Sequence, residues 1–251
     1  MDLELKGRVA VVTGCSVGIG RAAASLLAAE GAQTVIVARR EHLLATLAHD
    51  IEKRGGARPL AIALDLYDRA SPERLRDAVR DAYGHADILV NNAGGSRPMP
   101  WNSPDDAWDE SLAINFTAVR KLTQAFLPGM IARRWGRVVC VTGSGEPRQV
   151  NAATAAKAGV HAWAKGLSRE MGPHGITVNC VAPGRVHSEQ IDEKLHPTPE
   201  SQAEFARANI PLGYFGDAAD VAGLIAFLCS ARGRYITGER IHVDGGMHHA
   251  V

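Results

Sequence analysis

The chain has 251 residues, of which 46% are hydrophobic, and its formal net charge is +1 at pH 7. Acidic and basic residues are dispersed along it, which argues against a protein that binds nucleic acid or a membrane surface. Residues 1–4 carry acids and do not resemble a signal segment, and no apolar stretch is long enough to span a bilayer. We therefore expect a cytoplasmic protein.

Cysteine and histidine usage excludes two further classes. The four cysteines lie far apart, without a Cys-x-x-Cys pair, and three of them stand in apolar runs. This pattern predicts reduced thiols in a core instead of disulfides. The ten histidines show no His-x-x-x-His or Cys/His cluster, so we expect no metal site.

The first predicted strand ends in a glycine-rich turn. Residues 8–13 are apolar and β-favouring, glycines follow at positions 14, 18 and 20, and a helical pattern begins at once. Glycine suits this turn because a Cβ atom would hold a diphosphate away from the backbone N–H groups and the positive helix end. The turn predicts dinucleotide binding through Gly14, Ser16, Gly18, Ile19 and Gly20.

The second predicted strand, residues 34–38, stops at two arginines. This point lies about 20 residues beyond the glycine turn, where a carboxylate would bind ribose hydroxyls and an arginine would meet a 2′-phosphate. Arg39, with Arg40 as a second candidate, therefore predicts a preference for NADP(H) over NAD. The alternative is a basic helix start that faces water.

The third predicted strand, residues 60–65, ends at Asp65, followed by Leu66. Open parallel sheets bind ligands at the carboxyl ends of their strands, so Asp65 and Leu66 are candidates for contact with the adenine. Asp65 can equally cap the helix that follows, which we expect over residues 72–83.

The fourth predicted strand, residues 86–90, breaks into two amides, an alanine and two glycines. Packing residues have been exchanged there for hydrogen-bonding and close-approach residues, an exchange that usually faces a ligand. Asn92, Ala93 and Gly94 are therefore further candidates for cofactor binding.

Strands alternate with helices at roughly 25 to 30 residues per unit, which predicts one α/β domain over residues 1–251. The expected fold is a doubly wound parallel sheet with helices on both faces. The glycine turn together with residues 91–94 resembles the short-chain dehydrogenase/reductase family in length, order and spacing over essentially the whole chain. The resemblance implies a Rossmann-like fold, a nicotinamide cofactor, a small-molecule substrate, and a homodimer or homotetramer.

The resemblance continues downstream. Asn115, in a helix expected over residues 108–126, resembles the family's helix-kinking asparagine, which holds an active-site water by its backbone carbonyl. After a strand at 136–142, the helix expected over residues 152–171 carries small residues that resemble the family's subunit seam, although a core helix within one chain is the alternative. The next strand, 176–182, leads into a turn that resembles the nicotinamide-amide cradle, formed here by Pro183, Gly184 and Val186, with Ser188 beyond it.

Residues 187–210 turn polar and irregular in composition, which predicts a lid over the substrate. The last strand and turn of the predicted sheet fall within residues 236–246. Neither segment indicates which substrate the protein binds.

The catalytic pattern of the family is incomplete. The family places a tyrosine four residues before a lysine, because positions i and i+4 share a helix face and the ammonium lowers the phenol's pKa. Lys157 matches that lysine and would also bind the cofactor, but Ala153 stands four residues earlier. Alignment on residues 136–139 puts Gly143 at the place of the family's serine, and Ser144 is the possible substitute.

Three functions remain open. The first is an oxidoreductase in which another group moves the proton: water on the Lys157 and Asn115 relay, Glu146, Arg148 or His187. The second is a nucleotide-dependent lyase or dehydratase without net redox. The third is a non-catalytic NADP-binding protein or the silent subunit of a mixed oligomer. We favour the oxidoreductase, with Asn115, Lys157 and Ser144 as its catalytic candidates.

Overall fold

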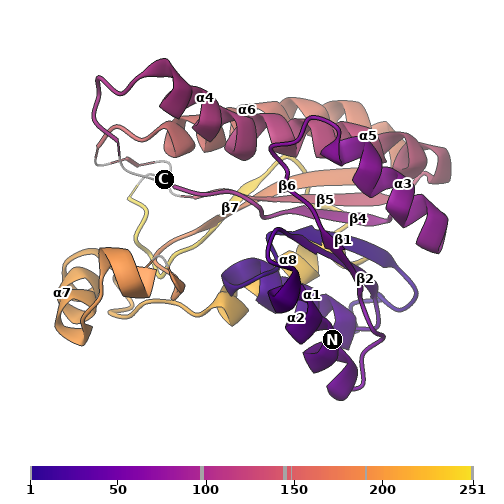
Figure 1. The fold of residues 1–251 in the computed structure, drawn as a ribbon, viewed down its shortest axis with the longest axis horizontal. Coiled ribbons are helices and arrows are strands. Elements are labelled where there is room, and N and C mark those ends of the chain that lie inside the picture. The colour runs from indigo at the N-terminus through magenta and orange to yellow at the C-terminus, as the bar shows by residue number, and fades with distance from the viewer. Residues whose placement is uncertain (1, 97–98, 144–145, 148, 190, 250–251) are drawn as a thin grey trace.

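A computed structural model describes residues 2–96, 99–143, 146–147, 149–189 and 191–249. In this part of the chain the strands are β1 (Val9–Thr13), β2 (Gln33–Ala38), β3 (Leu60–Ala63), β4 (Ile88–Asn91), β5 (Gly136–Val141), β6 (Ile176–Pro183) and β7 (Arg240–Val243). They form one parallel sheet in the order β3-β2-β1-β4-β5-β6-β7 (Figure 1). The chain reverses its direction of travel across the sheet between β1 and β4, the place where open sheets bind nucleotides.

Helices cover both faces of the sheet (Figure 1). They are α1 (Gly18–Ala29), α2 (Glu41–Lys53), α3 (Ser71–Tyr83), α4 (Asp105–Leu112), α5 (Ala118–Arg133), α6 (Ala152–Met171), α7 (Pro199–Asn209) and α8 (Ala218–Cys229). The helices α3, α4, α5 and α6 lie on one face, and α1, α2 and α8 lie on the other. The doubly wound α/β fold predicted from the sequence is confirmed.

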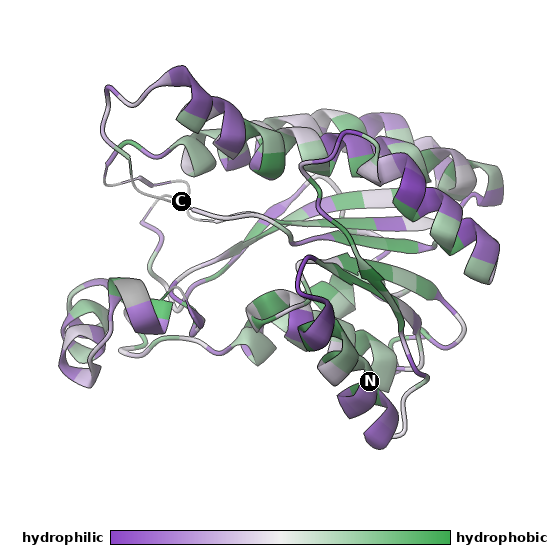
Figure 2. Cartoon of the chain, viewed as in Figure 1, coloured by the Kyte–Doolittle hydropathy of each residue, from purple (hydrophilic) through white to green (hydrophobic). Residues whose placement is uncertain are grey.

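The alternation of side chains along each strand divides the core into two clusters. On β1, Ala10 and Val12 belong to the cluster under α1 and α8, while Val9 and Val11 belong to the cluster under α3, α5 and α6. Since both faces of β1 are covered, its first four residues, Val9 to Val12, are apolar and buried. Figure 2 shows apolar segments alternating with polar ones along other strands of the sheet.

The helix expected over residues 108–126 differs from the structure. Two helices, α4 and α5, are joined by a five-residue π-helical turn, η1 (Ala113–Thr117), and α5 continues to Arg133. Asn115 stands in the middle of this turn. The interruption agrees with the kink that the family resemblance implies at this asparagine, and π turns often mark functional positions.

The segment expected to be an irregular lid is largely helical. A π turn, η3 (Ile191–Leu195), precedes α7, and the Thr198 hydroxyl caps α7 by accepting the Ser201 amide hydrogen at 3.2 Å. In Figure 1, α7 stands apart from the two helical layers. It packs on a small cluster of its own, in which Phe205 and Phe215 meet edge to face.

The prediction of core thiols is confirmed, because all four cysteines are buried and unpaired. Burial raises the pKa of the Cys15 thiol to about 12, so it stays protonated. Among the described residues no helix combines the length and the apolar character needed to cross a bilayer.

Candidate functional site

The glycine-rich turn joins β1 to the N-terminus of α1. Gly14 and Gly18 adopt positive φ angles of 72° and 60°, which favour glycine. No atom lies within 4 Å of the point where a Cβ of Gly18 would be. The helix α1 begins without a capping side chain and without an acid in its first turn, so its first amides remain available to an anion. These features fit a diphosphate cradle.

Asn92 holds the turn in place. Its Nδ2 donates to the carbonyl oxygens of Thr13 at 3.0 Å and Gly14 at 3.2 Å. A Cβ on Gly20 would overlap both that nitrogen and the Gly14 carbonyl oxygen. The Thr13 hydroxyl accepts the amide hydrogens of Asn92 and Ala93 at 3.0 Å each. The two sequence motifs that carry the family resemblance therefore form one hydrogen-bonded unit.

The predicted phosphate-binding arginines differ in their surroundings. Arg39 is exposed, and no described side chain is seen to bond to its guanidinium. Arg40 donates to Ser16 Oγ at 3.1 Å and pairs with the Glu189 carboxylate at 3.3 Å. The two arginines follow β2 side by side in the sequence, and of the two only Arg40 is bonded to other side chains in the described part of the chain.

The third strand brings Asp65 and Leu66 to the same edge of the sheet. The Asp65 carboxylate accepts the Tyr67 amide hydrogen at 3.1 Å, and Leu66 packs against the core under α3. The predicted alternative that Asp65 caps the following helix is wrong, because α3 begins at Ser71 with Ala70 at its N-cap position. Ile19, the apolar candidate at the glycine turn, packs against the other core cluster.

Asn115 ties the π turn to the end of β4. Its amide exchanges two hydrogen bonds with Gly95, at 3.2 and 3.0 Å, and also donates to the Ser111 carbonyl at 3.0 Å. A Cβ on Gly94 would lie 2.8 Å from Asn115 Oδ1 and 3.9 Å from Lys157 Cε. Gly94, Asn115 and Lys157 therefore lie close to one another.

Lys157 projects from α6 toward the end of β5. Its Nζ donates to the Thr142 carbonyl at 3.1 Å, and burial lowers the pKa of the ammonium to about 8. Ala153 lies four residues earlier on α6 and is 2% exposed. Ser144, predicted as a catalytic substitute, lies outside the described residues.

A histidine one turn further along α6 contacts the same threonine. His161 Nε2 lies 2.8 Å from Thr142 Oγ1, and the Thr142 hydroxyl donates to the Val181 carbonyl at 3.2 Å. Because that hydroxyl has one hydrogen, His161 is the donor in the first contact. His161 Nδ1 then accepts from Arg240 at 3.5 Å. Burial and the nearby Arg240 lower the pKa of His161 to about 4, so the ring is neutral.

The C-terminal segment completes this cluster. Arg240 also approaches His248 Nε2 at 3.5 Å, and the His248 ring stacks on His242 with centroids 4.0 Å apart. The His248 Nδ1 lies 3.4 Å from the Glu146 carboxylate, an ion-pair distance without hydrogen-bond geometry. Glu146 also accepts the His249 amide hydrogen at 3.2 Å. The sequence reasoning missed this cluster, although the i, i+4 spacing of Lys157 and His161 and the alternation of Arg240 and His242 could have indicated it.

The predicted nicotinamide turn lies at the end of β6. Val186 forms a parallel bridge with Gly216, and a Cβ on Gly184 would lie 2.6 Å from the Asp244 side chain. Pro183, paired with Val243, is the last residue of β6. The turn is therefore packed closely against the end of β7.

Two other predicted proton donors are engaged elsewhere or not described. His187 Nδ1 lies 2.8 Å from Asp192 Oδ1, within the lid segment. Ser188, predicted to lie beyond the nicotinamide turn, accepts the Ile191 amide hydrogen on its Oγ at 3.3 Å. It is therefore bonded within the lid segment as well. Arg148 lies outside the described residues.

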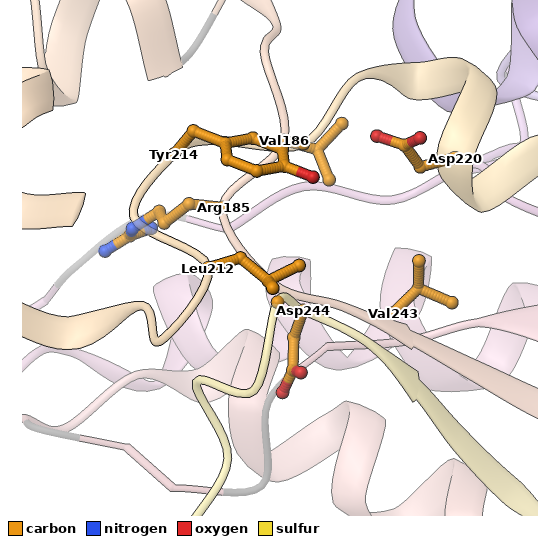
Figure 3. Close-up of a pocket in the computed structure, with 9 residues that line it drawn as sticks. Arg185, Val186, Leu212, Tyr214, Asp220, Val243 and Asp244 are labelled. Carbon is orange, nitrogen blue, oxygen red and sulfur yellow. The ribbon is translucent and has the colours of Figure 1, made fainter.

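A cavity of about 220 Å³ lies beside the nicotinamide turn (Figure 3). Tyr214 lines it together with Arg185, Val186 and Asp220. Val186 packs with the core under α1 and α8, whereas Lys157 stands on the helix of the opposite face. Tyr214 stands on the loop between α7 and α8 and is 60% exposed.

The comparisons with known proteins agree with this geometry. The chain belongs to the short-chain dehydrogenase/reductase family, because the family profile described as enoyl-(acyl carrier protein) reductase matches residues 14–248. A short-chain type dehydrogenase/reductase of Sinorhizobium fredii is 38% identical over 251 residues, covering 97% of this chain and 98% of that protein.

Two relatives carry more specific names. The 3-oxoacyl-(acyl-carrier-protein) reductase FabG of Salmonella typhimurium is 38% identical over 251 residues, covering 98% of this chain and 99% of that protein. The crystal structure of L-sorbose reductase from Gluconobacter frateurii with NADPH and L-sorbose is similar with a TM-score of 0.94 and 30% identity, covering 100% of both chains. From these matches, the chain is an NAD(P)-dependent oxidoreductase that acts on carbonyl or alcohol substrates.

Proposed function

We propose that this protein is an NADP(H)-dependent carbonyl reductase in which Lys157, with water, moves the proton that the family's tyrosine usually moves. The observation that carries the proposal is the pairing of Ala153 with Lys157 on one face of α6. Alanine has no transferable proton, while the buried ammonium has a pKa of about 8, close to the range where general acids work well.

The cofactor arrangement rests on the glycine turn and the two arginines. Gly14, Gly18 and Gly20 leave room for a diphosphate at the uncapped start of α1. Arg39, unpaired among the described side chains, would take the 2′-phosphate of NADP(H), with Arg40 beside it. The remaining candidates are proposed to surround the cofactor along the carboxyl edge of the sheet: Ser16, Ile19, Asp65, Leu66, Asn92, Ala93, Gly94, Pro183, Gly184 and Val186.

The chain's own residues would then complete the reduction. A reduced nicotinamide held at this site would supply the hydride for the carbonyl carbon, and the carbonyl oxygen would need one proton. The Lys157 ammonium, fixed on the Thr142 carbonyl, donates that proton through water and is reprotonated from solvent. Asn115 orders the backbone beside Gly95, and the backbone carbonyl of Asn115 in the π turn would hold the relay water.

The test follows NADPH absorbance with a panel of aldehydes, ketones and quinones. We expect turnover by the parent, and we expect Lys157→Gln to lower kcat by about 10²- to 10⁴-fold. Lys165→Gln is the matched control and should retain the parent rate, because Lys165 is exposed on the same helix and pairs with Glu239. NADPH binding by fluorescence is measured for each variant.

Other outcomes would favour the competing functions. Product formed without absorbance loss would indicate the lyase or dehydratase. Cofactor binding with no turnover of any substrate would indicate a non-catalytic NADP-binding protein. We further propose that residues 1–251 act as one domain, that residues 187–210 close over the substrate, and that the protein is a dimer or tetramer.

A further inference from the structure

A hydrogen-bonded bridge crosses from the glycine turn to the start of the lid segment. Arg40 stands at its centre, at the N-cap position of α2. Its Nη2 donates to Ser16 Oγ at 3.1 Å, and both terminal nitrogens contact the Glu189 carboxylate at 3.3 Å. Residues separated by 149 positions in the chain are thus joined beside the expected adenosine phosphate.

Glu189 uses the same face of Arg40 that a phosphate monoester would use. A guanidinium recognises carboxylates and phosphates through the same parallel N–H donors. Here Nη1 meets both Glu189 oxygens, and Nη2 divides its contacts between Glu189 and Ser16. A 2′-phosphate on Arg40 and the Glu189 carboxylate on Arg40 therefore exclude each other, and their negative charges would also repel.

The ion pair is weak enough to be displaced. The side chains of Arg40 and Glu189 are 43% and 50% exposed, so water screens their attraction. Arg39, beside it, stays available to the phosphate in either state. Displacement would release the first part of the lid, whose π turn begins two residues after Glu189.

We propose that Glu189 is a specificity-determining residue that competes with the 2′-phosphate of NADP(H) for Arg40 and so couples this phosphate to release of the lid. This proposal rests on the cofactor assignment above. Glu189 lowers the preference for phosphorylated over unphosphorylated cofactor and leaves adenosine binding itself unchanged.

Calorimetry with adenosine fragments tests the competition directly. The full-length parent, Glu189→Gln and Glu193→Gln are titrated with adenosine 2′,5′-bisphosphate and with 5′-AMP. We expect Glu189→Gln to bind the bisphosphate roughly two- to fivefold more tightly, the range of an exposed ion pair, with 5′-AMP unchanged. Glu193 is exposed in the same lid segment and is the matched control, so its variant should behave like the parent.

Two further measurements isolate the mechanism. In an Arg40→Gln background, Glu189→Gln should change neither affinity, because the contested guanidinium is gone. Hydrogen exchange of the amides of Asp192 and His196, which close the π turn on the Ser188 and Ile191 carbonyls, should accelerate when the parent binds the bisphosphate. The same amides should not respond in Glu189→Gln.

The outcomes distinguish a failure of the proposed competition at Arg40 from a failure of the cofactor assignment on which it rests. Unchanged or weaker bisphosphate binding by Glu189→Gln, in a parent that binds NADPH, overturns the competition alone. Equal changes for bisphosphate and 5′-AMP also overturn it, since Glu189 would then act on the adenosine. A folded parent that binds neither NADPH nor NADH overturns the proposed function together with it.

Discussion

His161 Nε2 donates to the hydroxyl of Thr142 at 2.8 Å, and the carbonyl of that same threonine accepts from Lys157. One residue at the end of β5 therefore receives two side chains from successive turns of α6. His161 Nδ1 accepts from Arg240 at 3.5 Å only while the ring is neutral, because protonation removes this acceptor and places two cations side by side. This relationship makes part of the fold's stability depend on pH.

We expect acid to destabilise the parent more than a His161→Gln variant. The pKa of His161 is about 4 in the folded chain and about 6.5 when unfolded, so the unfolded chain binds the additional proton. The contribution of neutral His161 is complete above pH 6.5 and declines as pH falls toward 4. The difference in Tm between pH 7.5 and pH 5 should therefore be smaller in His161→Gln.

An exposed histidine supplies the control for this measurement. His42 lies on the outer side of α2, and His42→Gln should reproduce the parent's loss of Tm between the two pH values. The other histidines are common to all three proteins. If the parent and His161→Gln lose the same Tm between pH 7.5 and pH 5, protonation of the His161 ring does not lower the free energy of unfolding.

Ala153→Tyr should increase carbonyl reduction. The phenol would stand one turn before Lys157, where the ammonium lowers its pKa. Ala153 is 2% exposed, so a ring there must displace neighbours. Ala153→Phe carries the same packing penalty without the hydroxyl. We expect the tyrosine variant to turn over at least tenfold faster than the phenylalanine variant in NADPH assays. Equal rates, with NADPH binding intact, would mean that the substrate carbonyl lies elsewhere.

The sequence predicts the parts of this site that are local. The strand, glycine turn and helix at residues 8–29 follow from periodicity and glycine spacing, and the boundaries of α6 match the prediction. The break at Asn115 is harder to predict, because it depends on hydrogen bonds to Gly95, 20 residues away. Only the family resemblance indicated it.

The remaining differences arise from long-range contacts and from weak patterns. α7 buries one small side chain, Ala206, so its sequence reads as polar and irregular. The cluster around Arg240 forms only when the tail folds back over β7 and His248 stacks on His242. No local sequence pattern predicts that the C-terminal tail folds back over β7.

Gly20→Ala should disable the glycine turn. The added Cβ would overlap Asn92 Nδ2 and the Gly14 carbonyl oxygen, so the turn must shift. We expect a loss of about 1 to 3 kcal/mol in the free energy of unfolding and no measurable NADPH binding. Gly223→Ala in α8 meets no atom within 4 Å and should stabilise the protein by about 0.5 to 1 kcal/mol. Urea unfolding measures both, and a stable Gly20→Ala variant that binds NADPH would contradict the cradle.

Arg39→Gln should reduce the preference for NADP(H). A charged hydrogen bond to phosphate contributes about 1.5 to 3 kcal/mol, so NADPH affinity should fall roughly 10- to 100-fold while NADH affinity changes little. Arg54→Gln removes an exposed charge at the other end of α2 and controls for the general field. Fluorescence titrations with both cofactors give the ratio. Equal losses for NADPH and NADH would assign Arg39 to the adenosine instead of the 2′-phosphate.

The pH dependence of carbonyl reduction should report Lys157. Burial lowers the pKa of its ammonium to about 8, and the proton donor is the charged form. The rate of reduction should therefore be constant below about pH 7 and fall about tenfold per pH unit above pH 8. Lys157→Arg keeps the charge at every accessible pH but donates its proton poorly, so we expect a low rate without this decline. Saturating NADPH, verified by binding at each pH, removes any contribution from cofactor affinity. If the rate of Lys157→Arg also declines near pH 8, another group donates the proton, and Lys157 acts on the cofactor alone.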